Sequence, residues 1–160
     1  MIYEFYHSKI AVWCYVLFLV LGVEIFTYFW HRFGAHDDYV PGIHSTHRIH
    51  HEAGDEDQAN GDFFWTLSAI ACLNLFLYIC VVVKIFSFGF ALLTSILSFS
   101  LLTFSYYIHA SYHNEDCWLN NYSWFIEQKR LHFLHHKYPN KNYGIVTHFV
   151  DGIMGTFVKN

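Results

Sequence analysis

Histidine is concentrated in four short segments of this 160-residue chain. The neutral imidazole nitrogen is a strong ligand for iron, zinc, copper and nickel, so histidines repeated at short spacing indicate metal binding. One helix with two histidines four residues apart is common, but four such segments in so short a chain indicate a site for more than one ion. Ten of the thirteen histidines lie in these segments, termed the histidine boxes: His31 and His36; His47, His50 and His51; His109 and His113; His132, His135 and His136.

The spacing within three of the boxes places their histidines on one face of a helix. Successive residues are rotated by about 100°, so positions i, i+3 and i+4 lie within about a third of a turn. The first box differs, because His31 and His36 are five residues apart and would be splayed on an ideal α-helix. We expect Gly34 to end the first helix, which would let His36 fold back toward the other imidazoles.

Ten imidazoles are too many for one ion, whereas two ions with four or five ligands each fit the number. Structural zinc sites are usually closed by four ligands, often including cysteine. Of the four cysteines only Cys117 lies near a box, and we interpret all four as small, buried apolar residues. The donor set therefore favours redox or Lewis-acid chemistry over a structural metal site.

The remaining three histidines carry weaker signals. We expect His7 at the surface or an interface, and His148 to be a bystander close to the last boxes. His44 lies one turn before His47 and is expected to line the site, with ligation as an open alternative.

One carboxylate is also placed where it could act on the site. Glu24, Tyr28 and His31 share one stripe of the first predicted helix, at positions i, i+4 and i+7. Glu24 lies in an apolar segment, where a carboxylate is costly and usually paired or functional. It either accepts an N–H from a ligand imidazole, which would fix the tautomer, or reaches toward the membrane interface.

The composition indicates which elements position the boxes. Hydrophobic residues make up 54% and charged residues 14% of the chain, against roughly 25% charged residues in a typical soluble domain. The sequence has no basic patch with interleaved aromatics of the kind that indicates nucleic-acid binding. We predict an all-α integral membrane protein with one domain, residues 1–160. Its transmembrane helices are expected at about 10–30, 63–83 and 88–108, with a histidine-rich cap from 31–51 and 109–148.

Two alternatives concern these apolar segments. Residues 63–108 could form the buried hairpin of a soluble protein, but they lack the polar face that such helices show. The first apolar run could be a signal peptide, but it is too long for that and lacks a small-residue cleavage site, so we interpret it as a retained anchor.

The order of segments predicts where the boxes lie. Two membrane passes separate His51 from His109, so all four boxes must face the same side. Seven of the nine Lys and Arg residues fall on that side, with Lys9 and Lys84 opposite. Positively charged loops favour the cytoplasm, so we expect the boxes on the cytoplasmic side of the membrane.

These residues together resemble the fatty acid hydroxylase / sterol desaturase superfamily of membrane oxygenases. The box series H-x4-H, H-x2-H-H, H-x3-H, H-x2-H-H is similar to its pattern, and Glu24, Tyr28, His31 and Arg32 resemble its first motif. The resemblance runs from about residue 20 to 157. It includes a tail of Asn142, Tyr143, Gly144, Thr147, Asp151, Gly155 and Thr156.

The resemblance implies two iron ions (zinc is possible in isolated protein) held by the ten box histidines beneath a membrane-embedded substrate tunnel. It implies dioxygen activation and hydroxylation or desaturation of a fatty acyl, sphingolipid or sterol C–H bond. Tyr143 and Asp151 would order the last loop, with Glu24 and Tyr28 also behind the ligands. No cytochrome b5-like segment is present, so an external donor of cytochrome b5 or ferredoxin type is expected. The acidic loop at 52–62 matches no family feature. Assembly of the chain into an oligomer is an open alternative.

Two other functions remain open on the sequence alone. Carotenoid ring hydroxylases share the boxes and a small size, although the Asn-Tyr-Gly tail favours the acyl or sterol branch. A membrane metal transporter or metal store would also bind ions, but its ligands should lie along a path near the bilayer midplane. The boxes instead lie at or beyond predicted helix ends on one side.

Overall fold

The computed structural model describes residues 2–37, 39, 41–53 and 59–160, with the side chains of 2–8, 41, 53 and 59–65 left aside. All regular elements of the described chain are helices and none is a strand, which confirms the predicted all-α class. In chain order the elements are α1 (Ile2–Phe29), the π-helix η1 (Trp30–His36), α2 (Pro41–Ala53), α3 (Ala59–Val82), α4 (Phe88–Tyr112), the 3-10 helix η3 (Trp118–Asn121), α5 (Ser123–Lys137) and α6 (Phe149–Met154).

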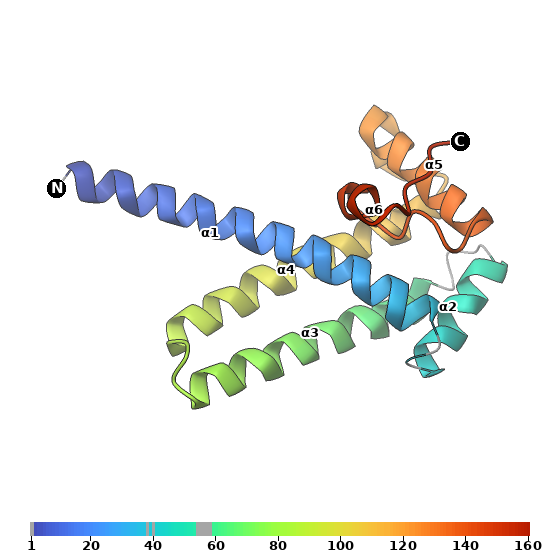
Figure 1. Cartoon of the computed structure of the whole chain (residues 1–160). Coiled ribbons are helices and arrows are strands. Elements are labelled where there is room, and N and C mark those ends of the chain that lie inside the picture. The colour runs from blue at the N-terminus through green and yellow to red at the C-terminus, as the bar shows by residue number, and fades with distance from the viewer. Residues whose placement is uncertain (1, 38, 40, 54–58) are drawn as a thin grey trace.

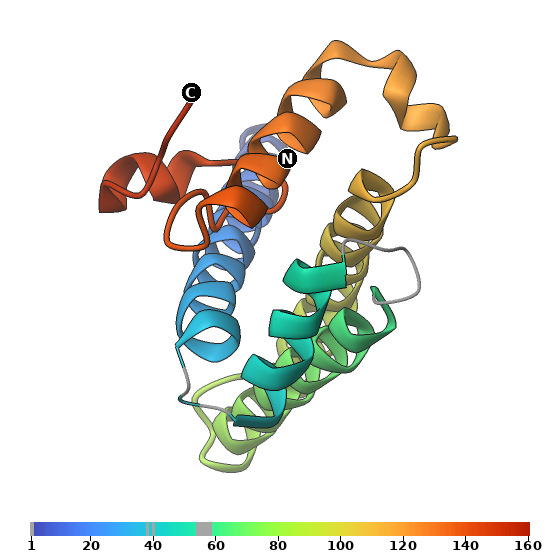
Figure 2. The same cartoon turned by 90° about the vertical axis from the view of Figure 1, so that its right-hand side faces the viewer.

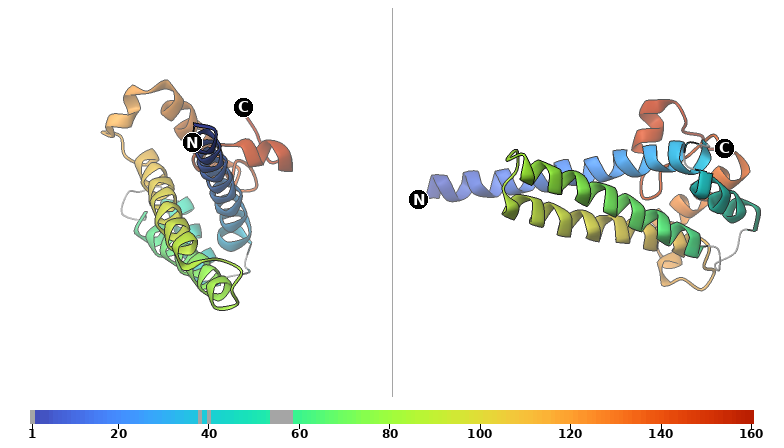
Figure 3. Two further views of the ribbon diagram at one scale, coloured as in Figure 1. Left: turned by 90° about the vertical axis from the view of Figure 1, so that its left-hand side faces the viewer. Right: turned by 90° about the horizontal axis from the view of Figure 1, so that it is seen from below.

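Three long helices extend in one direction from a cap of shorter ones (Figure 1). Among the described residues, two helical segments are long and apolar enough to cross a membrane, Lys9–His36 and Phe88–Tyr112. The sequence predicts a third crossing in α3, whose described apolar part is the shorter segment Thr66–Val82. Its antiparallel path beside α4 is clear in both views of Figure 3.

The turn between α3 and α4 lies where the sequence predicts it. Lys84 adopts a left-handed conformation with φ 61°, and its N–H bonds to the carbonyl of Val81. Ser87 then caps α4, because its hydroxyl accepts the N–H of Phe90. At the same level the Tyr15 hydroxyl lies 2.6 Å from the hydroxyl of Thr94, which ties α1 to this hairpin.

The cap closes over the opposite end of the long helices. Figure 2 looks onto it and shows α2 and α5 in front of the receding ribbons of α1, α3 and α4. A small apolar core joins the end of α4 to α5, and the C-terminal segment returns to contact α1. The core residues are Ile108, Tyr112, Leu119 and Phe125, each at most 5% exposed.

Candidate metal centre

The first box lies on a π-helix, which corrects the expected break at Gly34. The chain does not end its helix there but continues as η1 from Trp30 to His36. In a π-helix residues five apart are successive neighbours along one face, and such turns are frequent at functional sites. The Nε2 atoms of His31 and His36 therefore lie 3.3 Å apart. The expected return of His36 occurs, but by a wider helical turn.

Five imidazoles from three elements form one group, termed the five-histidine group. The ligand-type nitrogens of its members all lie within 4.8 Å of one another. The Nε2 of His36 lies 3.0 Å from those of His47 and His135. The members are His31 and His36 from η1, His47 and His51 from α2, and His135 from α5.

Four further imidazoles form a second, four-histidine group within the same distance limit. The Nε2 of His132 lies 2.8 Å from that of His113 and 3.0 Å from that of His136. The two groups adjoin, because the rings of His51 and His136 stack at 4.2 Å between centroids. The members are His50 from α2, His113 at the end of α4, and His132 and His136 from α5.

His109 is the one predicted ligand that belongs to neither group. Its ring is buried and lies 4.6 Å from that of His132 and 5.0 Å from that of His50. It therefore flanks the four-histidine group and faces the helices below. The structure thus brings nine of the ten box histidines into two groups of five and four, with the tenth beside them.

The donor geometry fits bound cations better than hydrogen bonding between rings. A neutral imidazole nitrogen carries one proton or one lone pair, yet Nε2 of His36 lies within 3.3 Å of three other Nε2 atoms. With metal–nitrogen distances of about 2.0–2.1 Å, two ligands at a right angle would be about 3 Å apart. The measured separations of 2.8–3.3 Å match that value, so these residues could hold a metal ion in each group.

Backbone carbonyls orient two of the rings. Nδ1 of His31 lies 2.7 Å from the carbonyl oxygen of Tyr143, and Nδ1 of His135 lies 2.6 Å from that of Lys141. A carbonyl only accepts, so each Nδ1 carries the proton and each Nε2 presents its lone pair to the group. This support from behind is typical of metal-binding histidines.

The three box histidines of α5 are held neutral. Burial, followed by repulsion from neighbouring imidazoles, lowers the pKa of His132 and His135 well below the ordinary value. The same two causes lower the pKa of His136 to about 2. Neutral imidazole is the form that binds a metal, so the apo protein is prepared for ions without having to release protons.

A buried carboxylate organises the loop that carries these carbonyls. Asp151 is 0% exposed and accepts hydrogen bonds from the N–H groups of Tyr143 and Gly144 and from the Thr156 hydroxyl. His148 Nδ1 lies 3.1 Å away. Burial alone would raise the pKa of Asp151, but these hydrogen bonds together lower it. A Cβ on Gly144 would overlap the Thr147 carbonyl oxygen, so only glycine fits there.

The same loop is tied to α1. The Tyr28 hydroxyl lies 2.9 Å from the hydroxyl of Thr156 and accepts a hydrogen bond from Arg32. The Tyr28 ring meets that of Tyr143 edge-on at 5.7 Å. Tyr28 therefore packs on Tyr143, whose ring in turn lies against those of His31, His36 and His135.

Glu24 is bound by the C-terminal loop. Its carboxylate accepts a hydrogen bond of 2.9 Å from the Thr147 hydroxyl, not from a ligand imidazole among the described residues. Of the two roles left open for Glu24 by the sequence, contact with an imidazole is not the one seen here, because the C-terminal loop packs over this turn of α1. Glu24 supports the site through that loop.

Sequence reasoning missed several supporting residues. The ring of Tyr112 stacks on that of His132 at 5.2 Å, and its hydroxyl donates to the carbonyl of Ile145. Asn142 adopts a left-handed conformation with φ 52° and exchanges hydrogen bonds with Val158. The Asn-Tyr-Gly motif marked this turn, but no sequence signal marked Tyr112.

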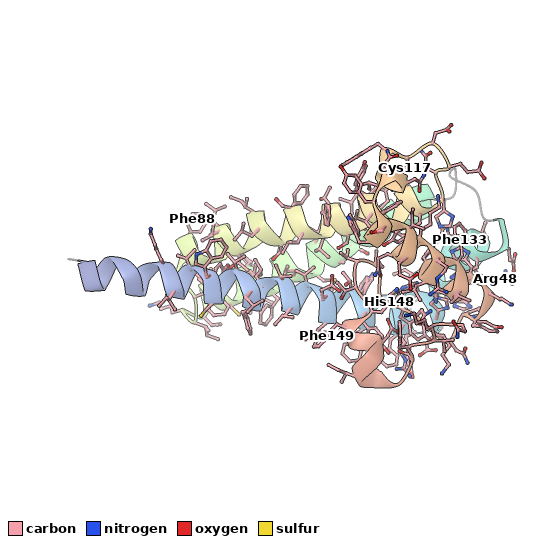
Figure 4. All side chains as sticks on the ribbon, turned by 90° about the horizontal axis from the view of Figure 1, so that it is seen from above. Arg48, Phe88, Cys117, Phe133, His148 and Phe149 are labelled. Carbon is pink, nitrogen blue, oxygen red and sulfur yellow. The ribbon has the colours of Figure 1, made fainter. Side chains whose placement is uncertain are left out.

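The remaining predicted positions lie outside the two groups. His44 is half-buried, with Nδ1 3.2 Å from the carbonyl of Ala35, and His148 lies against α6 (Figure 4). The side chain of His7 and residues 54–58 of the acidic 52–62 segment lie outside the described residues, whereas positions 52–53 and 59–62 belong to α2 and α3 and not to a loop. The four cysteines are free, and Cys14 and Cys72 are exposed, which corrects the expected burial of these two.

The family model described as fatty acid hydroxylase matches residues 16–156. The chain therefore belongs to the fatty acid hydroxylase family, within the fatty acid hydroxylase / sterol desaturase superfamily. This family membership implies an enzyme of the oxidoreductase type and, with the apolar helices, a membrane protein. Comparisons with curated proteins and with solved structures found no significant match.

Proposed function

We propose that this chain is a membrane oxygenase that hydroxylates or desaturates a lipid C–H bond with two metal ions, dioxygen and electrons from an external carrier. The observation that supports it most is the division of nine box histidines into groups of five and four beside each other. One group alone would suit a binding or structural site. Two adjoining groups that contain only imidazole donors, among the residues that the structure describes, suit paired redox ions.

The chain itself shapes the site, orients the imidazoles and shields them from water. The imidazoles are buried or half-buried, burial favours the neutral form of the three on α5, and the carbonyls of Tyr143 and Lys141 fix two tautomers. When bound, two iron ions would supply the activation of dioxygen that organic side chains lack. Hydroxylation then inserts one oxygen atom into the C–H bond and reduces the other to water, whereas desaturation removes two hydrogens and releases both oxygens as water. Each needs two electrons and two protons from outside.

The membrane arrangement belongs to the same proposal. The α3 helix forms a third crossing beside α1 and α4, so that the cap and all boxes share one side. The excess of Lys and Arg on that side supports a cytoplasmic cap. A cytoplasmic donor of cytochrome b5 or ferredoxin type could reach it there, while the lipid substrate approaches from the bilayer.

The test combines metal content, oxygen consumption and lipid analysis. Protein purified in detergent should hold about two irons per chain, and membranes with an electron donor should consume dioxygen. Lipids from cells with and without the protein, compared by mass spectrometry, should gain one oxygen or lose two hydrogens. Metal flux in liposomes without any lipid oxidation would instead establish a transporter.

A further inference from the structure

A small cavity separates the histidines from the long helices. Its volume is about 70 Å³, and it is lined by His31, His47 and His109 on one side and by residues of α1, α3 and α4 on the other. It is less than half the volume of an engineered cavity of about 150 Å³ that binds benzene. A chain of methylene groups fits this space, whereas a six-membered ring requires the side chains to move apart.

A second, longer cavity lies between the same three helices. Its volume is about 320 Å³, and its lining on α4 extends from Phe90 to Leu102. Twelve residues at about 1.5 Å each make this distance about 18 Å, more than half of the ~30 Å hydrocarbon core. Its lining is apolar apart from a few hydroxyl-bearing residues. Such a space suits a lipid tail.

Two side chains line both cavities, Phe26 of α1 and Leu102 of α4. They stand where the long cavity meets the small one. Leu102 precedes His109 by seven residues, or about 10 Å along the helix. A chain that passes directly from the long cavity into the small one would pass between these two residues.

We propose that Phe26 and Leu102 form a constriction that admits a single linear acyl chain and determines which of its carbons is oxidised. The proposal rests on the oxygenase function above and narrows its substrate to acyl lipids. A narrow passage holds the chain from both sides, which limits sliding and presents a restricted set of carbons to the small cavity. Ring systems are excluded by the size of that cavity.

The catalytic test compares constriction variants with matched controls in cells fed saturated fatty acids of defined length. Phe26→Ala and Leu102→Ala should change the ratio of positional isomers by at least about tenfold, as expected when a few methylene contacts are lost. Phe99→Ala and Leu93→Ala change the same residue types on α4, are 50% and 49% exposed and line neither cavity. They should leave the ratio unchanged.

A second measurement does not depend on oxidation. A fatty acid with a photoreactive group at its terminal carbon, added to metal-free protein in membranes, should label peptides around Ser105 and Tyr106 in the small cavity. Phe26→Trp should reduce that labelling at least about fivefold, since overfilling a tight site excludes the chain. Labelling near Phe76 and Phe90 in the long cavity should persist.

The outcomes separate the two proposals. Oxidised lipids with an unchanged isomer ratio in both alanine variants would overturn the constriction, as would small-cavity labelling that Phe26→Trp leaves intact. Oxidation of a ring lipid in place of acyl chains would overturn it too. If no oxidised lipid is found but labelling still responds to Phe26→Trp, the oxygenase proposal is wrong and the constriction between the two cavities is supported.

Discussion

At the scale of single residues, the Nε2 atom of histidine explains most of the centre. Among the described residues, seven Nε2 pairs lie 2.8–3.3 Å apart. This separation crowds the lone pairs of neutral rings and becomes favourable when the lone pairs share a cation. Crowding these nitrogens therefore costs free energy in the metal-free protein, and the same nitrogens would stabilise the metal-bound form.

Removing one histidine from each group tests whether the groups bind separate ions. His135→Ala and His50→Ala should each lower the iron content from about two per chain to about one and abolish lipid oxidation, because each removes a ligand from one group. Iron can be measured by inductively coupled plasma mass spectrometry. His44→Ala, outside both groups, should keep both ions; full iron content in His135→Ala would contradict the assignment.

Asp151 predicts a pH-dependent contribution to stability. Its pKa is lower in the folded chain than its ordinary value of 3.8, so the unfolded chain takes up the proton first as pH falls. Its stabilising effect is therefore present above pH 3.8 and is lost progressively below it. Asp151→Asn should lower the Tm clearly at pH 7, and the difference from wild type should shrink below about pH 4. An unchanged difference at low pH would contradict this.

At the scale of elements, the π-helix and the C-terminal loop place the histidines. Each contains one glycine, so alanine substitutions at Gly34 and Gly144 form a matched pair of variants. A Cβ on Gly34 would lie 3.7 Å from the Trp30 side chain, an ordinary contact. Gly34→Ala should therefore keep the fold and the metal, with up to about 1 kcal/mol of added stability. Gly144→Ala should cost about 1–3 kcal/mol through overlap with the loop backbone.

Thermal unfolding in detergent, with iron content measured alongside, checks both glycine variants. Loss of iron in Gly34→Ala would show that this glycine is needed for the turn, as the sequence alone suggested. A fully stable Gly144→Ala would show that the loop can move away from Asp151.

The elements also show how far sequence reasoning reached. Regular spacing predicted the helical boxes, and the break in the apolar run predicted the turn at Lys84, because these depend on local periodicity and turn chemistry. The roles expected for Tyr143 and Asp151 came from the family resemblance and not from local pattern. The π-helix was missed because helices were assumed to have 3.6 residues per turn. The Glu24 partner was missed because it lies 123 residues away in sequence, and contacts of that kind leave no local pattern.

At the scale of the whole molecule, the cap and the α3–α4 turn should lie on opposite sides of the membrane. The chain carries a glycosylation acceptor motif on the cap side, Asn121-Tyr122-Ser123. With a cytoplasmic cap this asparagine should stay unmodified, whereas an acceptor inserted after Lys84 on an extended loop should be glycosylated. Glycosidase-sensitive shifts on gels measure both. Glycosylation at both sites would contradict an odd number of membrane crossings between them. Glycosylation of Asn121 alone would reverse the predicted orientation and leave the number of crossings unchanged.

The contact between the C-terminal loop and α1 constrains how the protein can be made. His31 receives its orienting carbonyl from Tyr143, 112 residues later, and its group is completed by His135. A nascent chain still on the ribosome has inserted its early helices long before these partners emerge. Iron loading should therefore follow synthesis as a distinct maturation step, and a chain stopped before Asn142 should enter the membrane yet remain unmetallated.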